Sequence, residues 1–181
     1  MPIPKALPIG ILPPFLKSAT RRDGVSPYLA TPAELVERYA TSRARIRILE
    51  GLLAYRGELR RVGLSAGFQW IDGSFVETLN REPNDVDVVT ISSLPTSCSP
   101  DDEHLFKAAE TKKRFFCDAY FVDLSNGQAT WAISESVYWY GLFSHQRQTQ
   151  RWKGIVQMDL ASPDDDRSAR EQLATRKAGT P

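Results

Sequence analysis

The chain has 181 residues, of which 41% are hydrophobic and 25% charged, a size and composition typical of one globular domain. Its 23 Lys and Arg residues against 22 Asp and Glu residues leave a net charge of +1, which excludes a global electrostatic attraction to nucleic acid or to membranes. Two Cys and two His residues without metal-ligand spacing argue against a disulfide framework or a zinc site, and favour a cytoplasmic location.

The first 30 residues are expected to form an extended segment. Prolines at positions 2, 4, 8, 13 and 14 interrupt it, so neither a signal peptide nor a membrane-spanning helix is expected. Thr31-Pro32-Ala33-Glu34 is a capping box with proline at the first helical position, and it predicts a helix that begins there. A second helix over 42–62 has one apolar face and one arginine-rich face, which is interpreted as solvated, with contact to phosphate or RNA as the alternative.

Strands and helices then alternate along the chain. Strands are expected over 67–71, 84–91, 114–124 and 152–160, with the third in a central position because it is apolar on both faces. Between them we expect a turn at 72–74 with a helical turn over 75–79, a helix that opens at Ser99, and a helix over 129–143. The order predicts an α+β fold with a small mixed sheet flanked by helices. The domain is expected over 31–161, and 162–181 as a polar tail or helix.

Three aspartates stand where acidic residues are rare. Asp85 and Asp87 lie in one predicted strand, and Asp118 lies inside an otherwise apolar one. Side chains two apart in a strand share a face, and ~3.3 Å of rise per residue separates the Asp85 and Asp87 Cα atoms by roughly 7 Å. Burial of an unpartnered carboxylate is costly, so these side chains should bind a cation. Mg²⁺ or Mn²⁺ suits such oxygen ligands best.

Gly73-Ser74 joins a strand to a helical turn upstream of these aspartates. Glycine permits a close backbone approach, and the amides that follow it can hold phosphate oxygens together with the Ser74 hydroxyl. Either motif alone is a weak signal. Ten residues separate Gly73-Ser74 from Asp85-Val86-Asp87, and this combination predicts a phosphate and metal site.

With these motifs in that order, the chain resembles the nucleotidyltransferase superfamily that includes DNA polymerase beta. A likeness over most of the chain is to a poorly characterised bacterial group of small nucleotidyltransferase-like proteins. It is carried by Leu7-Pro8-Ile9-Gly10, Ile71-Asp72-Gly73-Ser74-Phe75-Val76, Pro83-Asn84-Asp85-Val86-Asp87 and Lys153-Gly154-Ile155-Val156.

The resemblance implies a polymerase beta-like fold and transfer of a nucleoside monophosphate from an NTP to an acceptor hydroxyl. Gly73 and Ser74 would hold the triphosphate, and Lys153 would contact phosphate. Asp85, Asp87 and a third carboxylate would bind two Mg²⁺ or Mn²⁺ ions. Asp118 is favoured as this third carboxylate over Asp123, because an unpaired acid in the middle of a strand is harder to explain otherwise.

Several alternatives stay open at this point. Lys153 has an ordinary interpretation as a surface lysine, Asp72 as a turn residue and Glu77 as a solvated helix residue. A catalytically silent binding module, such as an antitoxin or phage-defence partner of another protein, is the alternative to an enzyme. RNA binding through the arginine-rich helix is a weaker third function. The preferred NTP, the acceptor (RNA, protein or small molecule) and the oligomeric state are left undetermined.

Overall fold

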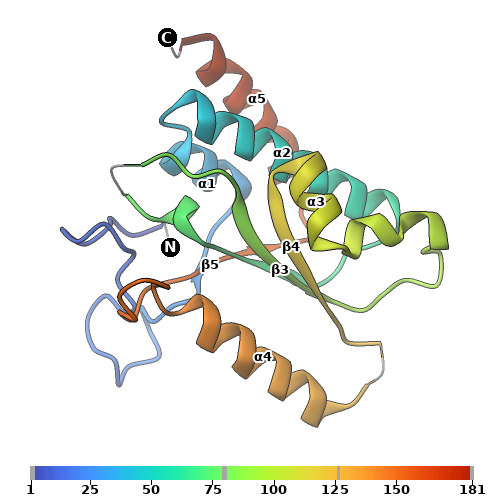
Figure 1. Ribbon diagram of the computed structural model, residues 1–181, viewed down its shortest axis with the longest axis horizontal. Coiled ribbons are helices and arrows are strands. Elements are labelled where there is room, and N and C mark those ends of the chain that lie inside the picture. Colours follow the sequence, from blue (N-terminus) through green and yellow to red (C-terminus); the bar gives the residue numbers. More distant parts are fainter. Residues whose placement is uncertain (1–2, 79–80, 126, 180–181) are drawn as a thin grey trace.

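A computed structural model describes residues 3–78, 81–125 and 127–179, which build a mixed sheet with helices on both faces (Figure 1). In this part of the chain the sheet has five strands in the order β1-β5-β2-β3-β4. Their bounds are Tyr28–Leu29 (β1), Phe68–Asp72 (β2), Val86–Ser92 (β3), Cys117–Asp123 (β4) and Val156–Asp159 (β5). β1 pairs with β5 and β3 with β4 in parallel, whereas β2 is antiparallel to β3 and β5. The expected α+β class with a small mixed sheet is confirmed.

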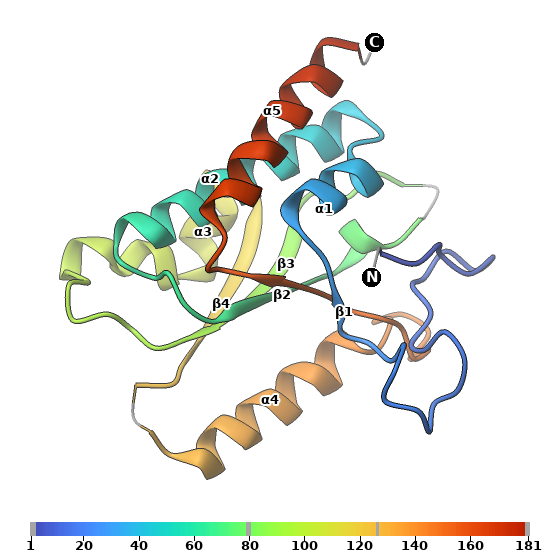
Figure 2. The same cartoon turned by 180° about the vertical axis from the view of Figure 1, so that it is seen from behind.

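The helices divide unequally between the two faces of the sheet. Helices α1, α2, α3 and α5 cover one face, and among the described residues α4 crosses the other (Figures 1 and 2). Their bounds are Pro32–Tyr39 (α1), Arg43–Arg61 (α2), Ala108–Phe115 (α3), Ala129–Phe143 (α4) and Pro163–Gly179 (α5), with 3-10 turns at Ser74–Val76 (η1) and Pro100–Phe106 (η2). No helix within the described residues is both long and apolar enough to cross a membrane.

Strands β2, β3 and β4 alternate their side chains between two cores, as a period of two requires. Val88 of β3 belongs to the larger core under α1, α2, α3 and α5. Its neighbour Val89 belongs to a smaller core with Trp70 of β2 and with Trp139 and Phe143 of α4. The smaller core covers only part of the sheet face that α4 crosses. The part of this face near the start of β3 lies outside the smaller core.

The start of α1 follows the expected capping box. The Thr31 hydroxyl accepts a hydrogen bond from the Glu34 amide at 3.2 Å, and the Thr31 amide donates to Glu34 Oε2 at 2.7 Å. Both bonds satisfy helix-terminal amides that would otherwise lack a partner. The expected helical turn over 75–79 is a shorter 3-10 turn that already begins at Ser74, and Leu79 lies outside the described residues.

The expectation of a central strand over 114–124 is wrong in two respects. β4 is an edge strand, and α3 continues through Phe115 before Phe116, with φ of 55°, turns the chain into β4. Its residues are apolar on both sides because helices cover both faces of the edge. Cys117 and Ala119 join the larger core, and the ring of Tyr120 packs on that of Trp139 with 4.7 Å between the ring centroids. An edge covered in this way has the same sequence pattern as a central strand.

The arginine-rich face of α2 is not solvated throughout, in contrast to the expectation. Arg45 and Arg56 are buried, with 8% and 0% of their surface exposed. Arg45 donates to the carbonyl oxygens of Phe75 and Glu77 at 2.7 and 2.8 Å, which fixes the turn after Gly73-Ser74. Two guanidinium nitrogens bonded to neighbouring carbonyls hold this turn more rigidly than a lysine could.

Residues 163–179 form the helical alternative expected for the C-terminal segment. α5 packs against α1 and α2, and it buries Ala169 and Leu173 in the larger core. Asp166 is fully buried and accepts hydrogen bonds from Arg56 Nε at 2.9 and 3.1 Å, with Arg60 as a second partner. This ion pair joins α5 to α2. The last two residues of the segment lie outside the described part of the chain.

Substituting Asp166 with Ala is therefore expected to lower the free energy of unfolding by about 3 kcal/mol, because it leaves a buried guanidinium without its charge partner. Urea denaturation followed by circular dichroism measures this. Asp164→Ala on the same helix is the matched control: its ion pair with Arg167 is exposed, and the expected loss is below about 1 kcal/mol. Equal losses in the two variants would contradict a structural role for the buried pair.

Candidate functional site

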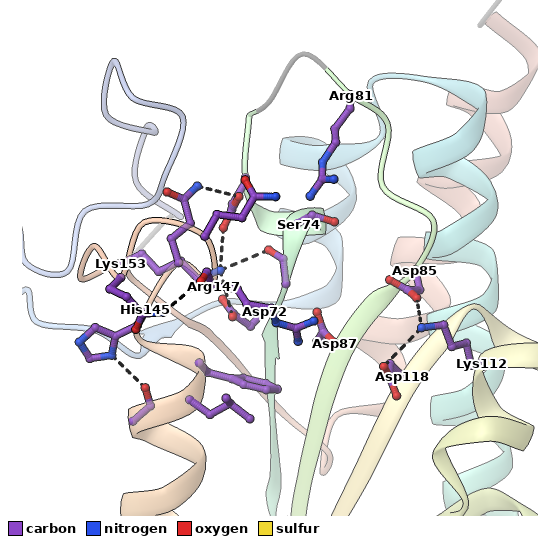
Figure 3. A pocket seen from close by; sticks show the side chains of 18 residues that line it. Asp72, Ser74, Arg81, Asp85, Asp87, Lys112, Asp118, His145, Arg147 and Lys153 are labelled. Atoms are coloured by element: carbon purple, nitrogen blue, oxygen red, sulfur yellow. Dashed lines mark hydrogen bonds and ion pairs between the residues drawn. The ribbon is translucent and has the colours of Figure 1, made fainter.

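Three aspartates form a row across three neighbouring strands. In the strand register Asp72 is opposite Asp87, and Asp87 is opposite Asp118. Side chains at paired positions point to the same face, which here is the face crossed by α4. Asp85 lies just before β3, two residues from Asp87, and lines the same cleft. Figure 3 shows Asp87 between Asp72 on one side and Asp118 on the other.

Gly73 lies against the central carboxylate of this row. It has φ of 79° and ψ of −165°, and a Cβ atom added there would lie 1.8 Å from Asp87 Oδ2. Both the conformation and the contact require glycine. Ser74 follows as the first residue of η1, so Gly73-Ser74 and Asp87 meet as the sequence predicts. The Gly73-Ser74 backbone and the Asp87 carboxylate therefore face a common space.

Gly73→Ala is expected to lower the free energy of unfolding by about 2–3 kcal/mol, because the added methyl group must displace Asp87 in addition to straining the backbone. Thermal and urea denaturation measure this. Gly127→Ala is the matched control: Gly127 also has positive φ, at 64°, but no described atom lies within 4 Å of the position that an added methyl group would take. The control should lose only the backbone contribution, about 1 kcal/mol. If Gly127→Ala lowered the free energy of unfolding as much as Gly73→Ala, the positive φ alone would explain both losses, and the contact with Asp87 would contribute nothing.

These residues line a cleft of about 400 Å³ between the end of the sheet and the C-terminal part of α4. All six residues predicted for the site line it, and so do several residues from the loop after α4. The lining consists of Asp72, Gly73, Ser74, Glu77, Arg81, Asp85, Asp87, Lys112, Asp118, Gly141, Leu142, Phe143, His145, Gln146, Arg147, Gln148, Gln150 and Lys153. Residues from four separate segments of the sequence thus meet in one space.

The competing acid Asp123 lies outside this cleft. It is at the other end of β4, where its Oδ1 atom accepts hydrogen bonds from the amides of Leu94 and Ser125 at 3.1 and 2.9 Å. These bonds, together with the Ser125 hydroxyl, lower the pKa of Asp123 even though burial acts in the opposite direction. Of the two candidates for the third carboxylate, Asp118 is the one positioned beside Asp87.

Lys153 is buried rather than a surface lysine, with 2% of its surface exposed. Its ammonium group lies 3.0 Å from Asp72 Oδ2 and 2.9 Å from Glu77 Oε1, and 3.4 Å from the carbonyl oxygen of Gly73. Burial lowers the pKa of Lys153, but the two carboxylates outweigh this and raise it. Lys153 thus ties the backbone of Gly73 to the two carboxylates at the buried side of the cleft.

Glu77 and Asp72 also differ from their ordinary interpretations. Glu77 is buried, and Gln146 from the loop after α4 donates to its second oxygen at 3.1 Å. Asp72 is the last residue of β2, and its Oδ1 atom is buried without a hydrogen-bond partner among the described residues. Burial raises the pKa of Asp72 to about 7, against the opposing effect of Lys153. Two buried carboxylates thus share one ammonium group.

Lys112, in the last turn of α3, is a site residue that the sequence interpretation missed. Its Nζ atom lies 2.6 Å from Asp85 Oδ2 and 3.4 Å from Asp118 Oδ2. The hydrogen bond to Asp85 raises the pKa of Lys112. One feature of the sequence could have indicated this residue. The basic residues 112–114 end a helix shortly before a strand whose second residue is acidic.

Asp87 has a different environment from its neighbours. Burial raises the pKa of Asp87, and the charges of Asp85 and Asp118 act in the same direction, against Arg147 and Lys153. Crowded carboxylates of this kind attract a cation, and their oxygen atoms are the ligands that Mg²⁺ and Mn²⁺ prefer. Within the described residues no three Asp, Glu, His or Cys side chains are arranged to hold a metal ion unaided. The donor chemistry fits a divalent cation, with Lys112 between two of the donors.

Comparison with known proteins gives one match. A family model described as a family of unknown function (DUF6932) matches residues 4–159, which include all the residues around the cleft and end before α5. Searches of curated proteins and of solved structures return no match to this chain.

Proposed function

The chain belongs to a family of unknown function, DUF6932, and from the cleft we propose that it is a metal-dependent nucleotidyltransferase with a polymerase beta-like fold. It transfers a nucleoside monophosphate from an NTP to an acceptor hydroxyl. NTPs are cytoplasmic metabolites, so the proposed location is the cytoplasm.

One observation carries this proposal. The Gly73-Ser74 turn is in contact range of the central carboxylate of an aspartate row, Asp72, Asp87 and Asp118, at the mouth of one cleft. A turn that leads into a short helical segment offers amides to phosphate, and carboxylates beside it offer oxygen atoms to a cation. Phosphate and cation sites that share a cleft are what nucleotidyl transfer needs. A structural salt-bridge cluster alone would not require the glycine contact.

The residues of the cleft would divide the work as follows. The amides after Gly73 and the Ser74 hydroxyl bind the triphosphate, while Asp85, Asp87 and Asp118 would hold Mg²⁺ or Mn²⁺. When bound, the cation would neutralise triphosphate charge and lower the pKa of the acceptor hydroxyl. Lys153 positions Gly73 through the hydrogen bond to its carbonyl oxygen.

Arginine side chains around the cleft supply the charge that a triphosphate requires. Arg81 and Arg147 both line it, and Arg147 is exposed and acts electrostatically on Asp87. Guanidinium groups bind phosphate oxygens with two parallel hydrogen bonds, so they suit the outer phosphates of an NTP. Arg147 lies in the loop after α4 and lines the same cleft as Gly73-Ser74.

A specific observation also favours the binding-module alternative. α4 is apolar on its outer side as well as its inner side: Ile133, Val137 and Tyr138 are 63%, 67% and 59% exposed. Exposed apolar patches of this kind mark protein–protein contacts. A catalytically silent protein that binds a partner protein and neutralises it would use such a surface. The intact carboxylate row favours catalysis over this function.

The test is incubation of the purified chain with Mg²⁺ or Mn²⁺ and each of the four NTPs labelled at the α-phosphate. Pyrophosphate release and transfer of label to RNA, to protein or to small hydroxyl compounds are measured. The proposal expects label transfer with at least one NTP, and loss of it in Asp85→Ala/Asp87→Ala. Activity that is equal in the double variant, or absent with all NTPs and acceptor classes, would leave the binding module as the function.

A further inference from the structure

Lys112 occupies the position between two of the proposed metal-binding carboxylates. Its Nζ atom contacts Asp85 Oδ2 at 2.6 Å and Asp118 Oδ2 at 3.4 Å, and Figure 3 shows the ammonium group between them. The two carboxylates are mostly buried, with side-chain exposures of 18% and 23%, whereas the lysine side chain is 52% exposed. The half-exposed side chain of Lys112 thus extends from the last turn of α3 to the two carboxylates.

The ion pairs in the cleft form two groups, and Asp87 belongs to neither of them. Lys153 pairs with Asp72 and Glu77, and Lys112 pairs with Asp85 and Asp118. Among the described residues Asp87 is in no ion pair, and its pKa is raised by burial and by the neighbouring carboxylates. The buried Oδ1 atom of Asp72, opposite Asp87 in the strand register, also lacks a partner among those residues. The oxygen atoms without a cationic partner among the described residues are therefore those of Asp87 and the Oδ1 atom of its neighbour Asp72.

A single ion at Asp87 matches how Mg²⁺ is usually held. Mg²⁺ loses its water ligands reluctantly and is bound by one or two carboxylates together with substrate phosphates. Asp87 contacts the Gly73 side of the cleft, where the phosphates are expected. Lys112 already provides Asp85 and Asp118 with a positive charge and hydrogen bonds, and an ammonium group needs no bound water to do so.

We propose that Lys112 takes the place of a second metal ion. Of the three carboxylates assigned above to cation binding, Asp87 then holds one divalent cation, while Lys112 holds Asp85 and Asp118. The inference rests on the proposed function, since it assumes that the cleft binds a cation with an NTP. Lys112 is then a positioning residue. It holds Asp85 and Asp118 in place with a positive charge that does not depend on the metal concentration.

The experiment is a Mn²⁺ titration of the full chain, with free Mn²⁺ followed by electron paramagnetic resonance, in the presence and absence of a non-hydrolysable NTP analogue. The wild-type chain is expected to bind about one Mn²⁺ ion, and Lys112→Met about two. Lys113→Met is the matched control: it removes an exposed lysine of the same helix, and should leave the number at about one. Asp87→Asn should lower it to zero. Thermal denaturation checks that each variant is folded.

The outcomes separate this inference from the proposed function. Two ions bound by the wild-type chain, no increase in Lys112→Met, or no ion in any variant would each overturn the role of Lys112. Label transfer from NTPs by the same preparations tests the enzyme independently. Transfer with two ions bound would keep the nucleotidyltransferase and reject the lysine, whereas one ion in the wild type and two in Lys112→Met without transfer would keep the lysine and reject the enzyme.

Discussion

Replacing Asp87 with Asn is expected to reduce transfer of label from NTP by roughly 10³-fold or more, while the folded chain becomes no less stable. The substitution keeps the size of the side chain but removes the charge nearest to the Gly73-Ser74 turn. Removing one preorganised electrostatic group from an active site costs about 10²–10³ in rate, and loss of a bound cation adds to this.

Stability is expected to respond to Asp87→Asn in the opposite direction. Asp87 has no ion pair among the described residues, and Asp85 and Asp118 repel its charge. The neutral side chain relieves this repulsion, so the free energy of unfolding should be unchanged or should rise by up to about 1 kcal/mol. Urea denaturation measures this beside the transfer assay. A charge that repels its neighbours in the free protein and is needed for activity is characteristic of a functional site.

Asp123→Asn is the matched control for Asp87→Asn. Asp123 is also an aspartate at the end of a strand, but it lies away from the cleft and bonds to backbone amides. Transfer should stay within about twofold of the wild type, since no charge in the cleft changes. An equal loss of activity in Asp87→Asn and Asp123→Asn would contradict the proposal. So would an Asp87→Asn chain that loses both stability and activity.

The parts of the site that the sequence predicted are those that depend on local rules. Asp85 and Asp87, two residues apart, line one cleft, and Gly73 marks a turn that only glycine adopts without strain. The α1 cap is equally local. Each of these features is specified by residues close together in the sequence, so the pattern and the structure agree.

The parts that were missed depend on contacts between distant segments. Arg56 is buried because Asp166, 110 residues later, folds back onto it, and nothing near Arg56 in the sequence reveals this partner. Lys153 looks like a surface lysine until Asp72 and Glu77 are brought to it. Lys112 lies on the helix before β4, and the register of β4 on β3 decides that it meets Asp85.

Lys153→Met is expected to lower the free energy of unfolding by about 4–5 kcal/mol, a large part of the stability of a typical domain. The substitution leaves Asp72 and Glu77 buried without a cation, and Asp72 already has one oxygen without a partner among the described residues. Urea denaturation measures the loss. Lys107→Met is the matched control: its ion pair with Glu103 is exposed, and the expected loss is below about 0.5 kcal/mol.

The loss in Lys153→Met should also depend on pH, with a sign that follows from the burial. Without the ammonium group, burial raises the pKa of Asp72 in the folded chain further above its value in the unfolded chain, because Lys153 no longer opposes it. The folded chain then retains protons that the unfolded chain has released, so its stability falls as the pH rises. The deficit should therefore be smaller near about pH 5 than near about pH 8, and adding Asp72→Asn and Glu77→Gln should recover part of it at both. If the loss in free energy of unfolding did not depend on pH, Lys153 would stabilise the chain through its packed methylene groups. The pairing of its ammonium group with Asp72 and Glu77 would then not be the main contribution.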